Sequence, residues 1–207
     1  METIIKVKHK NIGKIVEIHI KAFPSFFMTE LGPKFLMKYY NMVLSYHKGI
    51  FLAAEIDGLI TGFVAGFLEP SQFYAFLNKN KIDIGKTIIP VLIRKPMLVS
   101  KLFANFRRVN KFSFEEKKNE CELASIAVDP THSGHGVGKK LVKSFLDEAE
   151  KLGAEFVYLT TDAKNNDYVN GFYKSLGFIL YKTFYNEYNR EMNEYRYYFK
   201  KQKEVFI

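Results

Sequence analysis

The segment at residues 126–141, IAVDPTHSGHGVGKKL, constrains the fold of this chain more than any other. An apolar strand-like stretch runs into a turn with three alternating glycines, Gly134, Gly136 and Gly138, and the turn leads into an amphipathic helical pattern. Glycine has no Cβ, so the backbone of such a turn can adopt positive φ angles and approach a ligand closely. The first amides of the following helix have no intrahelical acceptor and favour an anion at the same place. The segment therefore predicts a strand–turn–helix unit that binds a phosphate group.

Two common phosphate-binding motifs do not fit this segment. The Walker A motif requires a glycine five residues before its Gly-Lys pair and Ser or Thr after it, but Ser133 and Lys140 occupy those positions. The dinucleotide-binding motif requires glycines at its first, third and sixth positions. Counted from Gly134 the sixth residue is Lys139, and the count from Gly136 fails in the same way. Neither a P-loop nor a Rossmann-type site is therefore predicted.

The loop resembles the acyl-CoA loop of the GNAT N-acetyltransferase superfamily, usually written Val-x-Pro-x-x-Arg-Gly-x-Gly-x-Gly before a Leu-bearing helix. Residues 128–138 read Val-Asp-Pro-Thr-His-Ser-Gly-His-Gly-Val-Gly, and Ser133 stands where the family usually has Arg or Gln. The family binds the pyrophosphate of acetyl-CoA mainly through backbone amides of this loop, which do not depend on that side chain. Lys139 and Lys140 keep the neighbourhood positive. The resemblance implies that acetyl-CoA binds here as a co-substrate.

A second segment supports the same family. Residues 165–178 read Asn-Asn-Asp-Tyr-Val-Asn-Gly-Phe-Tyr-Lys-Ser-Leu-Gly-Phe and resemble the family's Asn-x-x-Ala-x-x-Phe-Tyr-x-x-x-Gly-Phe. The resemblance is close over about residues 119–180 and loose over residues 1–70. It implies an α+β fold, a three-layer α/β arrangement around a mixed and mostly antiparallel sheet. The sheet is expected to be splayed open at the acyl-CoA cleft, between the strands at 122–128 and 156–161.

Apolar periodicity and turn residues outline the elements of a single domain spanning residues 1–207. Asp57-Gly58 lies between two apolar runs and predicts a tight hairpin, because both positions tolerate positive φ. A helical insert is expected at about residues 71–118, which is longer than a usual connection. The expected strands are residues 4–7, 50–55, 59–67, 122–128, 156–161, 178–187 and 191–199. The expected helices outside the insert are residues 11–22, 33–48, 137–152 and 169–176.

The positive charge of the chain is concentrated in this insert. Residues 71–118 contain eleven Lys or Arg against three Asp or Glu, a net charge of +8 out of +9 for the whole chain. The rest is nearly neutral, so the basic composition does not indicate a nucleic-acid partner. A helical hairpin packed on the domain is favoured over a lid for an acidic or phosphorylated acceptor and over a surface for an anionic membrane or a partner. The apolar stripe that favours the hairpin consists of Leu98, Val99, Leu102, Phe103, Phe106 and Val109.

Other features of the sequence exclude several classes of protein and site. The N-terminal residues are too polar for a secretory signal, and the apolar stretches at 50–54 and 88–93 are too short to span a bilayer, so a soluble cytoplasmic protein is expected. A single cysteine, Cys121, excludes an internal disulfide and a cysteine zinc site, and it is expected to be a buried thiol. The five histidines form no metal-binding pattern, so no metal is expected.

The resemblance also implies the cofactor-binding residues. Backbone groups of Ile126 and Val128 are implied to hold the pantetheine arm like an added strand, and the amide near Ala127 or Val128 to polarise the thioester oxygen. Asn166 is implied to contact the pantetheine arm, with capping of the next helix as its alternative role. The implied set is Ile126, Ala127, Val128, Ser133, Gly134, His135, Gly136, Val137, Gly138, Lys139 and Asn166.

Two residues are candidates for the proton transfers that accompany acetyl transfer to an amine. Tyr173 matches the family's tyrosine near the thioester sulfur, which protonates the departing thiolate, and its alternative role is core packing. Glu122 lies at the start of the loop-bearing strand, where several family members place a carboxylate that deprotonates the amine directly or through water. Its alternative is an exposed charge at a strand end. Strict alternation places Glu122 on the same face as Ala124, Ile126 and Val128.

The chain is therefore expected to be an acetyl-CoA-dependent N-acetyltransferase that moves acetyl directly to a primary amine. The favoured acceptor is small and anionic, such as a nucleotide-linked amino sugar. The alternatives are a protein or peptide acceptor, or a catalytically decayed acyl-CoA-binding sensor or scaffold. The acceptor site is expected between the loop after the first helix, the insert and the C-terminal hairpin, whose exposed edge also allows a homodimer. Its candidate walls are Phe26, Phe27, Tyr185 and Tyr188.

Overall fold

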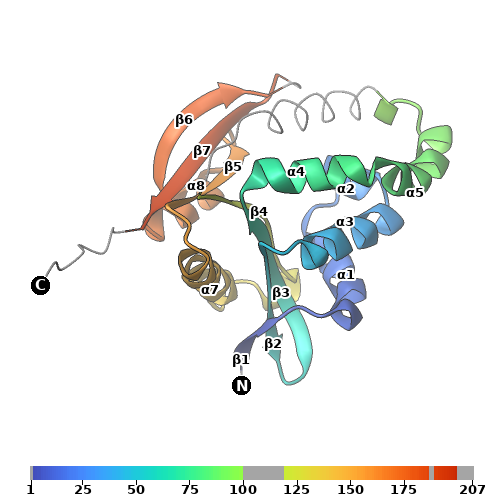
Figure 1. Ribbon diagram of the computed structural model, residues 1–207. Helices are drawn as coiled ribbons and strands as arrows, with labels where there is room; N and C mark the ends of the chain where they lie inside the picture. Colours follow the sequence, from blue (N-terminus) through green and yellow to red (C-terminus); the bar gives the residue numbers. More distant parts are fainter. Residues whose placement is uncertain (1, 100–118, 187–188, 200–207) are drawn as a thin grey trace, which may run out of the picture.

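The computed structural model describes residues 2–99, 119–186 and 189–199, which form a mixed sheet with helices on both faces (Figure 1). The strands are β1 (Glu2–Lys6), β2 (Gly49–Ile56), β3 (Leu59–Leu68), β4 (Glu120–Val128), β5 (Phe156–Asp162), β6 (Ile179–Tyr185) and β7 (Glu191–Tyr198). Within these ranges they lie in the order β1-β2-β3-β4-β5-β7-β6. All neighbours are antiparallel except β4 and β5, which are parallel. The predicted fold class, α+β with a mixed and mostly antiparallel sheet, is confirmed.

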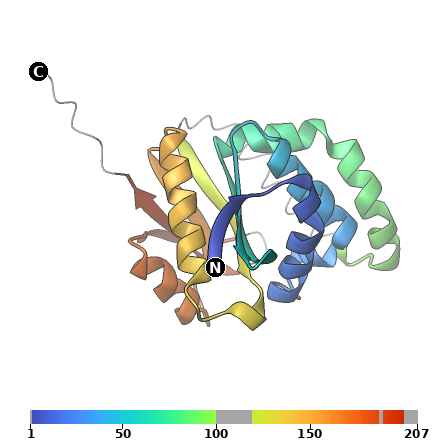
Figure 2. The ribbon, with the colours of Figure 1, turned by 90° about the horizontal axis from the view of Figure 1, so that it is seen from below.

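Helices on both faces make the sheet the middle of three layers (Figure 2). The helices are α1 (Ile12–Ala22), α2 (Phe27–Glu30), α3 (Pro33–Ser45), α4 (Pro70–Lys79), α5 (Lys81–Arg94), α7 (Val137–Lys151) and α8 (Asp167–Ser175), with 3-10 turns at His9–Asn11 and Pro130–His132. One face carries α1, α3 and α4, with α5 beside α3, and the other carries α7. No helix in the described part of the chain has the length and apolar character of a membrane span.

Each face of the sheet buries its own apolar cluster. Phe145 of α7 packs with Val64 of β3 on one side. On the other side Tyr40 of α3 packs between Phe51 and Phe63, with ring centroids 5.4 and 5.3 Å away. The two clusters follow from the sequence, because α1, α3 and α7 are amphipathic and β3 is apolar on both of its faces. Removal of this apolar surface from water is the main stabilising contribution.

The described elements follow the expected ones, with ends that differ by a few residues. The Asp57-Gly58 hairpin has φ angles of 50° and 79°, as a tight turn requires, and Pro33 begins α3. The short helix α2 was not expected. The insert is helical where it is described, as α4 and α5. Residues 100–118, with the apolar stripe from position 102 onward, lie outside the described residues.

A β-bulge in β4 overturns one expectation about side-chain direction. In the β3–β4 ladder Ala65 pairs with Ser125 and Gly66 with Leu123, so Ala124 is an extra residue in β4. Ile126 and Val128 pack toward the α7 cluster, whereas Ala124 packs in the cluster under α1 and α3. The prediction that Glu122 shares a face with Ile126 and Val128 is therefore wrong, because strict alternation assumes a ladder without a bulge. The prediction of a shared face with Glu122 is confirmed for Ala124 alone.

The sheet opens between β4 and β5, as expected. Among the described residues the parallel ladder covers only Glu120–Glu122 of β4, paired with Phe156–Tyr158 of β5. Both strands continue past this point, β4 to Val128 and β5 to Asp162, without further pairing to each other. On its other edge β4 stays paired with β3 as far as Val128. Among the described residues, the divergence after the Glu122–Tyr158 pair therefore leaves one edge of β4 unpaired beyond Glu122.

Candidate active site

Asp129 anchors the start of the glycine loop, directly after β4. Its side chain is buried, and Oδ1 accepts hydrogen bonds from the amide and the hydroxyl of Thr131 at 3.1 and 2.8 Å. The Lys21 ammonium lies 3.1 Å from Oδ2 and ties the loop to α1. These hydrogen bonds, the Thr131 ones foremost, lower the pKa of Asp129 to about 2. The carboxylate therefore holds the loop in place wherever it is ionised.

Asp129→Asn is expected to destabilise the protein at neutral pH and to lose this effect in acid. The folded pKa lies below that of an unfolded Asp, about 3.9. Ionised Asp129 therefore stabilises the fold above about pH 4, and the contribution is lost as pH falls from about 4 toward 2. Urea unfolding of both proteins between pH 7 and pH 3 measures the difference in their free energies of unfolding. A difference that stays constant down to pH 3 would contradict the role of the charge.

Two of the three loop glycines have the backbone conformation that only glycine adopts easily. Gly134 and Gly136 have φ angles of 84° and 81°, and a Cβ at either would have no atom within 4 Å, so both border open space. Gly138 is helical, and its Cβ would lie 3.5 Å from Phe172 of α8 and 3.9 Å from Val128. The hydroxyl of Ser133 donates to the Pro130 carbonyl at 2.9 Å. Ser133 therefore braces the loop, and the start of α7 meets β4 and α8 closely.

The predicted cofactor residues gather at this junction. Ile126, Ala127 and Val128 lie on β4 beyond the point where β5 diverges. The loop from Ser133 to Gly136, including His135, is exposed and leads into α7, whose first residue Val137 is buried. Lys139 is exposed, while Lys140 pairs with Glu2 at 2.6 Å. Their contact with acetyl-CoA stays a prediction.

Asn166 joins the end of β5 to the start of α8. It occupies the N-cap position, but its side chain makes no capping bond. Its amide instead donates to Thr161 Oγ1 at 2.8 Å and to the Asp162 carbonyl at 3.1 Å, and Asn170 donates to the same carbonyl. Side-chain capping, the alternative considered for Asn166, is therefore wrong. The implied contact with the pantetheine arm is a prediction that this arrangement permits.

Tyr173 lies on α8 among aromatic side chains of the α7 cluster. It is 6% exposed, and its ring contacts those of Phe172, Phe178 and Tyr195. Burial raises the pKa of its phenol well above the ordinary value, so the group carries its proton at neutral pH. Packing is thus part of its role. The protonated state is also the one that a general acid needs.

Glu122 is buried between two tyrosines, which the sequence did not indicate. Its carboxylate is on a residue 8% exposed, so the alternative of an exposed charge at a strand end is wrong. The Tyr74 hydroxyl of α4 donates to Oε1 at 3.1 Å and to Oε2 at 3.0 Å, and the Tyr158 hydroxyl of β5 donates to Oε2 at 3.0 Å. Burial and the charge of Glu122 raise the pKa of Tyr158 well above its ordinary value. Tyr158 therefore stays a donor.

A second series of buried hydrogen bonds also reaches β4, and the sequence analysis did not predict it. The His19 ring nitrogen Nδ1 lies 2.7 Å from the Tyr40 hydroxyl, which lies 3.2 Å from Ser125 Oγ on the stretch of β4 beyond the divergence. Burial lowers the pKa of His19 to about 4, so the ring is neutral at pH 7. A polar residue on the apolar face of a helical pattern was the only signal that could have indicated it.

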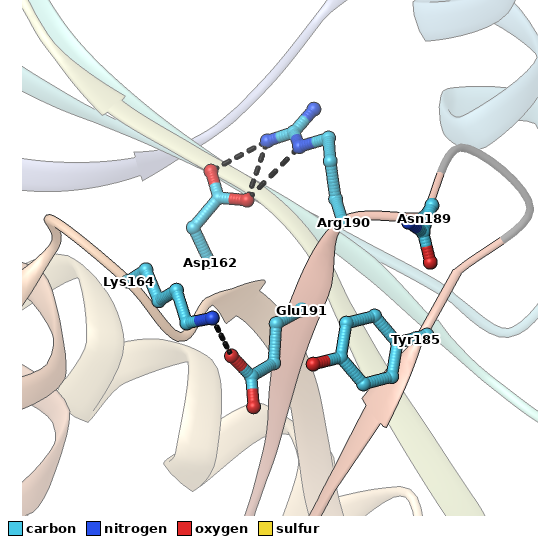
Figure 3. A pocket seen from close by; sticks show the side chains of 6 residues that line it. All are labelled: Asp162, Lys164, Tyr185, Asn189, Arg190 and Glu191. Carbon is cyan, nitrogen blue, oxygen red and sulfur yellow. Dashed lines mark hydrogen bonds and ion pairs between the residues drawn. The ribbon is translucent and has the colours of Figure 1, made fainter.

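A pocket of about 390 Å³ lies where β5 ends beside the turn between β6 and β7 (Figure 3). Arg190 binds both carboxylate oxygens of Asp162, and Lys164 pairs with Glu191 at 2.9 Å (Figure 3). The Arg190 guanidinium also lies 5.9 Å from the Phe26 ring, so the loop after α1 meets this turn. The residues that line the pocket are Asp162, Lys164, Tyr185, Asn189, Arg190 and Glu191.

The candidate acceptor walls are thereby partly located. Tyr185 is exposed and lines the pocket, Phe26 is exposed and lies near Arg190, and Phe27 is half-buried at the start of α2. Tyr188 lies outside the described residues. In the described ranges, no three His, Cys, Asp or Glu side chains gather as a metal site would need. Cys121 is a buried free thiol, as expected.

Known sequences are similar to the part of this chain that contains the glycine loop. Residues 100–178 match the model of the Acetyltransferase (GNAT) family. The chain is 30% identical over 74 residues to N-alpha-acetyltransferase 30 of Saccharomyces cerevisiae, covering 36% of this chain and 42% of that protein. It is 38% identical over 60 residues to the ribosomal protein bS18-alanine N-acetyltransferase of Escherichia coli K12, covering 29% and 40%. The chain thus spans less than half the length of these curated relatives.

Comparison with solved structures covers the whole fold. The crystal structure of the ribosomal-protein-S18-alanine N-acetyltransferase from Escherichia coli superposes with a TM-score of 0.64 at 16% identity, over 100% of this chain and 99% of that one. The structure of yncA from Salmonella typhimurium with its cofactor acetyl-CoA has a TM-score of 0.60 at 14% identity, over 98% and 96%. Identities this low show the fold alone. Residues 100–178 are thus similar to the GNAT acetyltransferase family, and the chain shares its fold with these two acetyltransferase structures.

Proposed function

We propose that this protein is an acetyl-CoA-dependent N-acetyltransferase that moves acetyl directly to a primary amine within a ternary complex. The observation that carries the proposal is the divergence of β4 from β5 beside a glycine loop at the N-terminus of α7. A free strand edge suits an extended amide-bearing arm, and a helix N-terminus with exposed loop amides suits a pyrophosphate. Acetyl-CoA carries both groups.

Different residues bind different parts of acetyl-CoA in this proposal. The amides from Gly134 to Gly138 bind the pyrophosphate, and the edge of β4 at Ile126 and Val128 binds the pantetheine arm. The amide near Ala127 or Val128 polarises the thioester carbonyl, as an oxyanion donor does. The loop needs no Arg at position 133 for this, because Ser133 braces the backbone that presents the amides.

Two proton transfers accompany the acyl transfer. Glu122 takes a proton from the acceptor's ammonium group, and the neutral amine then forms a C–N bond to the acetyl carbon. The C–S bond breaks as Tyr173 donates its proton to the departing thiolate. The excess proton on the new amide nitrogen returns to Tyr173, and Glu122 releases its proton to solvent. Glu122 contacts α4 while Tyr173 packs on the α7 side, so base and acid approach the cleft from opposite faces.

The amino terminus of a protein or peptide is the proposed acceptor. The support is that relatives of this chain are named for N-alpha and alanine N-acetylation. A small anionic amine, such as a nucleotide-linked amino sugar, is the second candidate because the insert carries most of the positive charge. Thiol release measured with a panel of peptides and with amino-sugar nucleotides separates the two.

Isothermal titration of acetyl-CoA tests the cleft itself. Saturable binding is expected, with NAD as a control that does not bind and 3′-dephospho-CoA as a probe of the 3′-phosphate. Binding followed by release of free thiol in the presence of an amine supports the enzyme. Binding without turnover across the amine panel supports the decayed sensor or scaffold instead. No binding of acetyl-CoA would refute the proposal at its first step.

Gly136→Ala is expected to weaken acetyl-CoA binding about tenfold, through strain of the left-handed backbone that presents the loop amides. Gly153→Ala is a matched control at the other end of α7. Gly136 and Gly153 have φ angles of 81° and 85°, and a Cβ at either has no atom within 4 Å. Both variants should lose similar stability in urea, while only Gly136→Ala changes the titration of acetyl-CoA. Equal affinities in the two variants would contradict a cofactor role for the loop.

A further inference from the structure

The buried carboxylate of Glu122 lies where three elements meet, at the point where β4 and β5 diverge. Glu122 and Tyr158 form the last pair before β4 and β5 diverge, and Tyr74 reaches the same carboxylate from α4 of the insert. The insert is thus joined to the strand that borders the proposed acetyl site. No family motif in the sequence pointed to this contact.

Hydrogen bonds from two elements set the orientation of this carboxylate. The Tyr74 hydroxyl lies within 3.1 Å of both oxygens, and the Tyr158 hydroxyl lies 3.0 Å from Oε2 only. Donors from two different elements limit rotation of the carboxylate about its last bond. Hydrogen bonds to an ionised acceptor are also stronger than neutral ones, so these phenols favour the charged form.

Tyr74 is itself held firmly by the start of α4. The Glu69 amide donates to the Glu120 carbonyl at 2.9 Å, and the Glu69 carboxylate pairs with Lys48 at 2.6 Å. Pro70 then begins the helix, and the Tyr74 ring packs edge-on against Phe67 of β3 at 5.8 Å. These contacts with β3 and β4 fix the start of α4 and thereby place the Tyr74 hydroxyl beside Glu122.

We propose that Tyr74, with Tyr158, is a positioning residue that holds Glu122 ionised and oriented to take the proton of the acceptor's ammonium group. The inference rests on the proposed function, in which Glu122 is the base. It makes the insert part of the active site and assigns α4 a function that the basic charge of the insert did not indicate.

Titratable side chains of three described strands and helices lie near Glu122 or act on its partners. They are Tyr74 on α4, Tyr158 on β5, and Cys121 beside it on β4, while Glu120 acts on Tyr158. Burial and the charge of Glu122 raise the pKa of Cys121, so this thiol stays neutral.

Tyr74→Phe removes the hydroxyl and keeps the ring. Loss of its hydrogen bonds should shift the acid limb of the pH profile of kcat/KM upward by about one pH unit, which lowers the rate below neutral pH about tenfold. Tyr158→Phe should shift the same limb. Tyr46→Phe is the matched control, because the Tyr46 hydroxyl bonds the Leu68 and Glu69 carbonyls and its ring contacts Phe73 without touching Glu122. It should lower the melting temperature and leave the profile in place.

A second measurement follows the protonation of the Glu122 carboxyl group in the absence of substrate. Carbon-13 NMR of glutamate-labelled protein, with Glu122→Gln to assign the signal, reports the titration midpoint of the carboxyl group. A midpoint raised by about one pH unit in Tyr74→Phe and unchanged in Tyr46→Phe supports the inference. An unchanged midpoint overturns it even in an active enzyme. A wild-type protein that binds acetyl-CoA yet acetylates no amine refutes the proposed function instead, whatever the midpoint shows.

Discussion

Tyr173→Phe is expected to lower kcat for acetyl transfer by about a hundredfold or more and to leave the affinity for acetyl-CoA nearly unchanged. The substitution removes a hydroxyl that burial keeps protonated and leaves the ring among its aromatic neighbours. The departing thiolate then lacks its proposed proton donor, while the loop and the β4 edge that are proposed to bind acetyl-CoA are intact. Steady-state thiol release and isothermal titration measure the two quantities separately.

Tyr195→Phe is the control for loss of a buried phenol in the same cluster. Tyr195 is 1% exposed, and its ring centroid lies 6.4 Å from that of Tyr173. Both substitutions change packing in the same way, so both should shift the melting temperature by similar small amounts. Only Tyr173→Phe should change kcat. Equal kcat values in the wild type and in Tyr173→Phe would remove Tyr173 from the mechanism and leave it a core residue.

Gly66→Ala is expected to have the largest effect on stability, a loss of about 3 kcal/mol in the free energy of unfolding. An alanine Cβ would collide with the Glu122 carbonyl oxygen and lie 2.6 Å from Cζ of Phe145. Neither partner can yield easily, because the carbonyl belongs to the β3–β4 ladder and Phe145 is fully buried in the α7 cluster. Relief of the collision would disturb the bulge and with it the direction of Glu122.

Gly85→Ala is the opposite case and serves as the control. Gly85 lies inside α5, and a Cβ there would have no atom within 4 Å. Alanine in such a helix position should raise the free energy of unfolding by about 0.5 to 1 kcal/mol. Urea unfolding compares both variants with the wild type. A Gly66→Ala protein with an unchanged urea midpoint would show that the bulge is not tightly packed.

The conformation of the glycine loop and of the helix that follows it could be predicted from the sequence because it is local. The glycines with positive φ, the start of α7 at Val137 and the turn into α8 depend on residues close together in the chain. Their conformations follow from steric rules that act over a few positions. The divergence of the sheet was expected from the family resemblance, and the position at which the β4–β5 pairing stops agrees with it.

The contacts of Glu122 and Arg190 could not be predicted in the same way because they join distant parts of the chain. Tyr74 and Glu122 are 48 residues apart, and Glu122 and Tyr158 are 36 apart. Arg190 similarly meets Asp162 and Phe26 only after the sheet is assembled. One local signal did exist: Gly66 inside an otherwise apolar strand is typical of a bulge or of a close approach of another chain segment.

The sequence by itself determined the glycine loop, the amphipathic helices and the places of the strands along the chain, because steric limits of the backbone and apolar periodicity act within short stretches. Only the tertiary structure decided which way Glu122 points and what surrounds it. The β3–β4 register inserts the extra residue Ala124, which separates the direction of Glu122 from that of Ile126 and Val128. A bulge of one residue moves a side chain to the other face of a sheet, and its position is set by packing across strands.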